Sequence, residues 1–454
     1  MLRTAIKSEA GFLSGTVLAV LGIGLLVRFI LCPTLTYPFD VEHWAVILQN
    51  IASGNDLYGL SGYFYTPVWG YILGAEGAVM SLFGNIDLMG NRFTDLFGIE
   101  TLGFRFFTAT TTTPVFNTVM KLPLIAVDLL VGYLVWDLVM EKTGTRKKAD
   151  LAFSLWFLCP VVVYMSSIQV QFDCISALLA LLSVLLARKN RYFLAGAVLM
   201  VAALTKMFPA FLAPVLVFYV WRKHGESRQA LVQVAKAVAG ALIAFCIIYA
   251  PQIFDGTVFD SLSFVFGRAT ESDPFTLLYV YAMAIVAIAA TVVSTYMMHH
   301  RGNDLDDVLL LSSTLTLAFA NLISGGPQYC IVYLPLLAFL AATYRNRLFV
   351  RCFVAIGVLS MLVGILNNNI SILTSVAEYW GWIDPQTIVD LIDDTYWFNF
   401  ALRAIVQTFQ TLMLIVTAVF VGTELLDLGE RHYYGQNHIR AIKDKIGGWH
   451  TGSS

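Results

Sequence analysis

The chain has 454 residues, of which 58% are hydrophobic and 13% are charged, and its mean hydropathy is +0.73. A soluble domain carries about 25% charged residues, so this composition excludes a water-soluble globular protein of this size. The formal net charge of −2 leaves no basic footprint for nucleic acid. The sequence therefore predicts an all-α polytopic membrane protein.

The first apolar segment, residues 11–32, follows a short basic N-terminal stretch that contains Arg3 and Lys7. No small-residue cleavage site follows it, so we expect an uncleaved first transmembrane helix that leads outward. Lys and Arg in short loops mark the cytoplasmic side of a membrane protein. By this rule the inner side holds the loops 141–148, 188–191, 222–228, 299–301 and 345–351 and the tail 431–445.

Sidedness also decides how to interpret residues 68–83, an apolar segment with several glycines and Glu76. If this segment crossed the membrane, the basic residues 146–148 would face outward, against the positive-inside rule. We therefore expect a re-entrant or interfacial segment on the outer side, within a first outer loop that extends from residue 33 to 117.

Eleven further apolar segments follow, so the sequence predicts a single domain (residues 1–454) with about twelve transmembrane helices and both termini inside. These segments are 118–139, 150–167, 173–187, 192–205, 208–221, 230–250, 275–298, 308–323, 329–344, 352–370 and 398–425. Residues 371–398 between the last two are acidic and are expected to form a solvated outer loop. Residues 426–454 are expected to form a cytoplasmic tail.

Asp40 follows the first transmembrane segment by eight residues, and Glu42 is close behind it. Apolar residues between 41 and 53 recur at helical spacing, which predicts a helix along the membrane surface. Asp40 stands where an N-cap of that helix would stand. Capping does not account for Glu42, and a desolvated carboxylate at the lipid–water boundary would have the raised proton affinity of a general base.

Three charged residues in the apolar segments also need a reason. Arg28 lies one turn before the outer end of the first segment, where it would either snorkel to the interface or contact an anion. Lys121 and Asp128 lie seven residues apart on one helical face, which favours an internal ion pair.

Several polar residues fall in turns that the predicted topology places on the outer side together with Asp40. They are Gln171, Asp173, Lys206, Gln328 and Tyr329. Polar groups that converge on one membrane face form the default candidate for an active site.

The motifs at these positions, in this order, resemble those of GT-C superfamily glycosyltransferases, integral-membrane enzymes that take a sugar from a polyprenyl phosphate. The similarity is to the mannosyltransferase that adds the first mannose of the GPI anchor and to bacterial proteins related to the second one. The matching stretches are Tyr37-Pro-Phe-Asp40-Val-Glu42, Gly54-Asn-Asp-Leu-Tyr58, Tyr63-Phe-Tyr65-Thr-Pro67, Lys121 to Asp128, Gln171-Phe-Asp173, Lys206-Met-Phe-Pro209 and Gln328-Tyr329. The second acidic position is Glu42 where the family pattern has Asp, and residues 85–117 have no counterpart.

The resemblance implies a GT-C-like helical bundle in which Asp40 deprotonates an acceptor hydroxyl and the lipid phosphate leaves from the opposite face of the sugar. A fixed cation would stabilise that phosphate, and Lys206 is the first candidate, before Arg28, Arg105 and Arg268. Sugar or head group would contact Gln171, Asp173, Gln328, Tyr329 and Tyr65. Glu42 would assist Asp40 or hold a metal, but an Asp-x-Glu pair alone does not define a metal site, and no cofactor is expected.

We therefore expect an inverting glycosyltransferase, a mannosyltransferase, that uses a polyprenyl-phosphate sugar at the outer face of the plasma membrane. Its acceptor would be a lipid-linked or cell-envelope glycan. The alternatives are a transporter or flippase of a lipid-linked glycan and a scaffold subunit of a larger assembly. A transporter would place its charged residues at mid-membrane in broken helices, whereas here the polar groups collect at one face.

Overall fold

The computed structural model describes residues 11–58, 63, 65–82, 89–93, 109–259, 261–262, 274–300, 305–323, 326–344, 347–367 and 371–447. These residues are helical or form helix connections, apart from an antiparallel hairpin of β1 (Met89–Phe93) and β2 (Ala109–Thr112). The predicted all-α class is thus confirmed, and the hairpin is a local addition within the predicted outer loop.

Two helices open the bundle. α2 (Gly15–Thr34) is capped by Ser14, whose hydroxyl accepts a hydrogen bond from the Val17 amide at 2.9 Å. α5 (Pro114–Thr143) begins at proline after the Thr113 cap and ends at Gly144, whose φ of 59° suits glycine because it has no Cβ. Capping at both ends satisfies amides and carbonyls that the helices leave unpaired.

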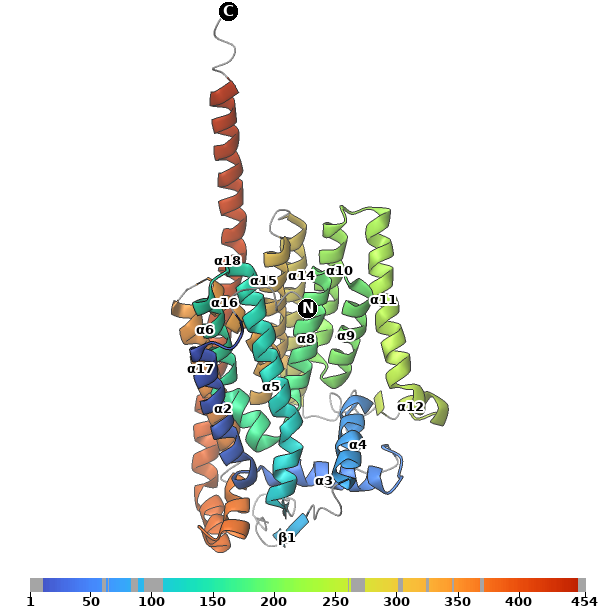
Figure 1. Cartoon of the computed structure of the whole chain (residues 1–454), viewed down its shortest axis with the longest axis vertical. Coiled ribbons are helices and arrows are strands. Elements are labelled where there is room, and N and C mark those ends of the chain that lie inside the picture. The colour runs from blue at the N-terminus through green and yellow to red at the C-terminus, as the bar shows by residue number, and fades with distance from the viewer. Residues whose placement is uncertain are drawn as a thin grey trace, which may run out of the picture.

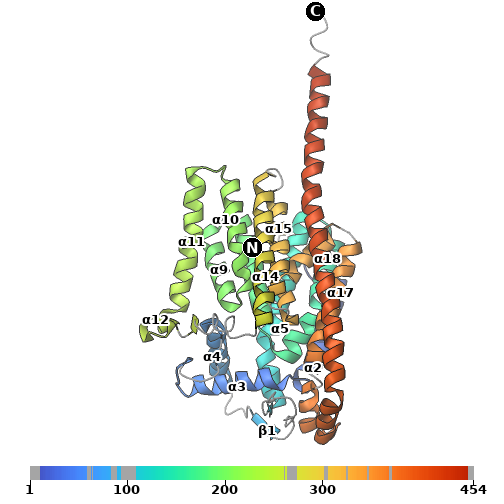
Figure 2. The same cartoon turned by 180° about the vertical axis from the view of Figure 1, so that it is seen from behind.

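The remaining helices of the body run roughly alongside α5 (Figures 1 and 2). They are α6 (Arg146–Phe157), α8 (Asp173–Arg188), α9 (Tyr192–Thr205), α10 (Leu212–Lys223), α11 (Arg228–Ile248), α14 (Pro274–His300), α15 (Leu305–Ala320), α16 (Leu334–Thr343) and α17 (Arg347–Asn367). Short helical pieces connect them: α7 (Pro160–Tyr164), η2 (Met165–Gln169), η3 (Phe208–Phe211), η4 (Asn321–Ile323) and η5 (Pro327–Val332).

Within the described residues, each predicted apolar segment falls mainly on helix. Among the described residues, six helices are long and apolar enough to cross a membrane, and a seventh span is counted if the bent pair 146–157 and 160–169 is one crossing. Several others, such as α9 with its 14 residues, are shorter than the roughly 20 residues that a perpendicular crossing requires. The chain is a multi-pass membrane protein, and the number twelve stays a prediction.

One end of the bundle carries α3 (Pro38–Ala52), which lies across the bundle axis, and α4 (Pro67–Ser81), which stands beside it (Figure 1). The two helices approach closely because α4 presents Gly70 and Gly77 to α3 and its following loop. A Cβ at Gly70 would lie 2.5 Å from the Leu57 side chain, and one at Gly77 would lie 3.2 Å from Leu48. α12 (Ala250–Asp255) and the hairpin lie at this same end.

The last helix, α18 (Pro385–Gly447), is 63 residues long and projects beyond the opposite end of the bundle (Figures 1 and 2). The prediction of a loop at 371–398 is wrong over most of its length. That segment contains the short turns η6 (Ser371–Leu373) and η7 (Val376–Trp380) and then the start of α18. Asp384 accepts a hydrogen bond from the Thr387 amide at 3.2 Å, so one acidic residue of the segment starts the helix. Residues 426–447 of the predicted tail continue this helix.

The charged residues inside the bundle pair differently from the prediction. Asp128 forms its ion pair with Arg28, at 3.1 Å, and both side chains are 0% exposed. The Lys121 ammonium instead donates to the carbonyls of Cys32 and Leu35, at 2.7 and 2.9 Å. Lys121 thereby satisfies carbonyls at the end of α2, a role that seven-residue spacing on α5 could not reveal.

Candidate functional site

Asp40 lies in the first turn of α3, two residues after the helix starts, and Tyr37 holds the cap position. The interpretation of Asp40 as the N-cap is therefore wrong. Its Oδ2 accepts hydrogen bonds from Gln171 Nε2 at 2.6 Å and from Gln169 Nε2 at 3.3 Å. Two side-chain amides from one distant turn thus fix the orientation of this carboxylate.

The turn that supplies both amides has an unusual backbone. Met165–Gln169 form a π-helical turn, and Val170 follows with φ 57° and ψ 48°, the left-handed region. A β-branched residue there is strained by roughly 1–2 kcal/mol, and π-turns often mark functional sites. The backbone N–H of Gln171 donates a hydrogen bond to the Met165 carbonyl at 3.0 Å, which closes the turn. The backbone conformation therefore directs Gln169 and Gln171 to the same acceptor.

Burial raises the pKa of Asp40 from 3.8 to about 6. The hydrogen bonds from Gln169 and Gln171 and the charge of Lys206 act in the opposite direction, while the nearby Asp173 adds to the increase. Asp40 itself is only partly exposed. A carboxylate of this kind is ionised at neutral pH yet basic enough to accept a proton from a hydroxyl.

Lys206 follows the end of α9, and its ammonium lies 3.5 Å from the Asp173 carboxylate at the start of α8. The same nitrogen lies over three aromatic rings, 4.3 Å from the centre of Phe172, 5.0 Å from Tyr65 and 5.5 Å from Tyr329. Negative ring faces and a carboxylate both favour the charged ammonium. Lys206 is therefore a fixed cation bordered by half-buried tyrosines.

Aromatic packing connects Asp40 with Lys206. Trp44, one turn after Asp40 on α3, contacts Tyr65 and Phe172 at ring-centre distances of 5.5 and 6.0 Å. Trp69 stacks on Phe172 at 4.6 Å. Because Phe172 stands between Gln171 and Asp173 in the sequence, this packing holds the turn that carries both polar residues against α3 and α4.

The tyrosine-rich loop before α4 is held by its own hydroxyls. Tyr58 donates to the Tyr65 carbonyl and Tyr63 to the Thr66 carbonyl, each at 2.8 Å. The Tyr63 oxygen also accepts from the Gly70 amide at 2.7 Å. These bonds fix the Tyr65 backbone, which positions its ring next to Lys206.

Of the other predicted site residues, Tyr329 joins the Lys206 cluster and also contacts the Phe208 ring at 4.7 Å. Gln328 precedes it in η5 and is half-buried. Glu42 is half-buried on α3. Residues two positions apart do not share a helix face, so Glu42 and Asp40 lie on different faces of this helix.

Arg28 is engaged elsewhere, by Asp128 and by the Phe157 carbonyl at 2.9 Å, and no contact in the described part of the chain joins it to Asp40. Arg105 and Arg268 lie outside the described residues. Gln169 is the residue that sequence reasoning missed. The sequence indicates only that Gln169 stands two positions before Gln171. The left-handed backbone at Val170, which brings both side chains to Asp40, cannot be predicted from a valine.

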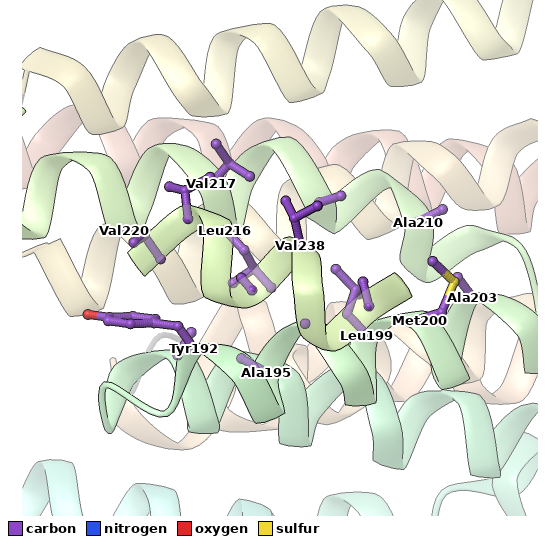
Figure 3. A pocket seen from close by; sticks show the side chains of 16 residues that line it. Tyr192, Ala195, Leu199, Met200, Ala203, Ala210, Leu216, Val217, Val220 and Val238 are labelled. Carbon is purple, nitrogen blue, oxygen red and sulfur yellow. The ribbon is translucent and has the colours of Figure 1, made fainter. Parts of the chain in front are cut away.

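An apolar slot lies between α9, α10 and α11 and has a volume of about 180 Å³. Figure 3 shows Tyr192 at one end and Met200, Ala203 and Ala210 at the other. Its lining includes small residues of all three helices: Ala195, Gly196, Ala213, Ala237 and Ala241. Ala203 and Ala210 flank Lys206 in the sequence, so one end of the slot lies at the turn that carries this cation.

In the described residues no three His, Cys, Asp or Glu side chains form a group that could hold a metal ion. The chemistry available at the site is therefore described by a partly accessible carboxylate, two amides, a fixed cation and three aromatic rings. This set can accept a proton, orient hydroxyls and bind an anion.

The model of glycosyltransferase family 87, a family of GT-C-type membrane glycosyltransferases, matches residues 107–325. This range contains Gln169, Gln171, Asp173 and Lys206, and it lies between Asp40 and Gln328. No curated protein matches the chain. The resemblance predicted from the sequence is confirmed: the match supports a membrane glycosyltransferase of the GT-C superfamily.

Proposed function

We propose that this enzyme transfers mannose, with inversion, from a polyprenyl-phosphate-linked donor to a hydroxyl of a lipid-linked or cell-envelope glycan. The observation that carries the proposal is the position of the Asp40 carboxylate. Two side-chain amides hold it, and it lies close enough to Lys206 for that cation to lower the pKa of Asp40. A base for the acceptor and a cation for the leaving phosphate are the two groups that such a reaction requires.

Asp40 acts on the acceptor. Both amides donate to Oδ2, so Oδ1 is the oxygen that takes the proton of the attacking hydroxyl. That hydroxyl oxygen forms a bond to the anomeric carbon as the bond from this carbon to the phosphate oxygen breaks. The proton moves to Asp40 and the electron pair leaves with the polyprenyl phosphate, so charge and atoms balance.

Lys206 binds the phosphate that leaves. Its charge is fixed by Asp173 and the surrounding rings, so it can stabilise the negative charge that develops on the leaving oxygen without rearrangement. Tyr65, Tyr329 and Gln328, which are half-buried, border the space where the sugar would lie. The Lys206 ammonium supplies the positive charge that this step requires.

The apolar slot supports a lipid-linked donor over a soluble nucleotide sugar. From Tyr192 to Ala203 the slot follows about 17 Å of α9, at 1.5 Å per residue, and its lining is apolar. A ligand with an anionic head at Lys206 and an isoprenoid chain in the slot matches both features. The family match also favours a transferase over the transporter alternative.

The sidedness of the basic loops supports an active site on the outer face of the plasma membrane with cytoplasmic termini. The site end of the bundle carries α3, α4 and α12, and the long α18 projects from the other end (Figure 1). Labelling of single cysteines introduced at Asp56 and at Lys189 in intact cells, with a membrane-impermeant reagent, tests this orientation. We expect labelling at position 56 only, and labelling only at 189 would reverse it.

The function is tested by transfer of mannose from a synthetic polyprenyl-phosphate mannose to endogenous glycolipid in membranes that contain the full chain. Asp40→Asn should abolish transfer, whereas Asp56→Asn, an exposed acid of the same loop, should leave it unchanged. Glu42→Gln tests the predicted assisting role separately. Full transfer by a folded Asp40→Asn variant would refute the assignment, and transfer from a nucleotide sugar alone would refute the lipid donor.

A further inference from the structure

A second apolar depression lies on the lipid-facing side of the protein, between α17 and α18. Its floor and walls include Val354, Ala355 and Val358 of α17 and Phe409 and Met413 of α18. Arg351 is the one charged residue among those that line it. Both helices are candidate membrane spans, so this groove faces lipid chains along its length.

The groove has a structural cause. Towards the end of α17, Gln410 Nε2 donates to Ser360 Oγ at 2.7 Å and Arg403 donates to the Asn367 amide oxygen at 2.6 Å. These two bonds hold the helices together at that end. Nearer the start of α17, one residue that faces the space between α17 and α18 is Ala355. Its side chain is too small to fill this space.

Two arginines lie near the start of α17, and one of them, Arg351, lines the groove. Arg347 and Arg351 are four residues apart in the first two turns of α17, so they share one helix face. Both are exposed, and no ion pair to either is present in the described part of the chain. Other cations at helix ends do have an acidic partner, as Arg188 has in Glu141 at 3.3 Å. The groove therefore has an apolar length and an uncompensated positive end.

We propose that this groove binds one anionic phospholipid, with its phosphate at Arg351 and Arg347 and an acyl chain along Ala355 and Val358. Guanidinium groups bind phosphate through paired hydrogen bonds, and basic pockets between membrane helices select anionic head groups. The site is built from α17 and α18, which do not carry Asp40, Gln171 or Lys206. It is thus separate from the proposed transfer reaction and does not depend on it.

Native mass spectrometry of the full-length protein, released from detergent with added phosphatidylglycerol or phosphatidylcholine, tests the proposal. We expect the wild type to retain one phosphatidylglycerol in preference to phosphatidylcholine. Arg351→Gln should weaken phosphatidylglycerol retention about fivefold, the effect expected for one basic residue at an anionic membrane surface. Ala355→Leu should weaken retention of this lipid by filling the groove while both arginines remain.

Lys236→Gln is the matched control, because Lys236 is an exposed cation of the span α11 that lines neither cavity. It should retain the lipid as the wild type does. Equal retention of both lipids by the wild type, or an unchanged preference in Arg351→Gln, would overturn the proposal. A loss in Lys236→Gln as large as that in Arg351→Gln would also overturn it, since the attraction would then be a property of the whole basic surface.

Discussion

Two of the regions that bury ionic groups differ in what those groups can still reach. Between α2 and α5, Arg28 and Asp128 are 0% exposed and bind each other at 3.1 Å. The Lys121 ammonium donates its hydrogen bonds to carbonyls at the end of α2. At α3, Asp40 is partly exposed, and the half-buried rings of Tyr65 and Tyr329 border Lys206. The first region is closed and the second is open.

The comparison shows that buried charge alone does not identify a site. An ion pair inside a bundle can be structural, because its partners satisfy each other once the desolvation penalty is met. Around Asp40 and Lys206 the neighbours include side-chain amides and aromatic rings, which a substrate can displace or contact. Mutations should therefore affect stability in the first region and transfer in the second.

The largest expected effect is in the closed region. Arg28→Ala leaves Asp128 as an unpaired buried charge, which typically costs 3–5 kcal/mol. We expect the variant to accumulate poorly and to melt at a lower temperature by thermal-shift fluorescence. Arg28→Leu combined with Asp128→Leu should recover much of the stability. Wild-type melting of Arg28→Ala, with transfer lost, would mean that Arg28 belongs to the site after all.

Lys206→Met tests the open region. Removal of the cation should lower kcat/KM by about 10²–10³-fold, the usual loss for one transition-state charge contact. Loss of the Asp173 partner also lowers stability, so Lys206→Met with Asp173→Asn separates the two effects. Steady-state transfer by the double variant should remain low although its melting temperature recovers. Lys189→Met, an exposed lysine, should behave as the wild type in both measurements.

The pH dependence of transfer tests the environment of Asp40. Since only the ionised carboxylate accepts a proton, the rate should rise with pH through about 6 and then level off. Gln171→Ala removes a donor that lowers the pKa, so the rising limb should move to higher pH. The stability contribution has the opposite sign: it is present below the ordinary value of 3.8 and is lost as pH rises through about 6. If the rising part of the pH–rate profile has the same midpoint in Gln171→Ala as in the wild type, a group other than Asp40 controls the rate.

The smallest effect is expected at the strained turn. Val170→Gly removes a left-handed β-branched residue and should change the free energy of unfolding by no more than about 1 kcal/mol. Transfer should fall only a few-fold, because Gln169 and Gln171 become less well fixed. Val170→Ala keeps the positive φ cost and serves as the control. A stability loss of several kcal/mol in Val170→Gly would mean that the valine packs more than it strains.

The sequence predicted the helical class and the position of most helices, and it predicted a site that the structure is consistent with but does not test. Apolar length gave α9 at its observed bounds, and loop charges suggested that Asp40, Gln171 and Lys206 share one end of the bundle, which the contacts among them support. These features follow from local composition, which a single sequence displays directly.

Pairing between distant residues could not be read in the same way. Lys121 and Asp128 share a helix face, yet Lys121 binds the Cys32 carbonyl and Asp128 binds Arg28, both on α2, and no spacing within α5 encodes that choice. Likewise, the role of Gln169 depends on a π-turn and a left-handed valine, which residue propensities argue against. The start of α18 was predicted as a loop because its residues are acidic. Acidic residues are also favoured in the first turn of a helix, so composition alone does not distinguish the two structures.

The most direct test of the central claim separates donor binding from chemistry in Asp40→Asn. Binding of a fluorescent polyprenyl-phosphate analogue and a single-turnover transfer of mannose are measured on the same reconstituted protein. The account predicts donor affinity within about threefold of the wild type and a single-turnover rate lower by at least about 10²-fold, the usual contribution of a general base. Normal single-turnover transfer by Asp40→Asn would contradict it.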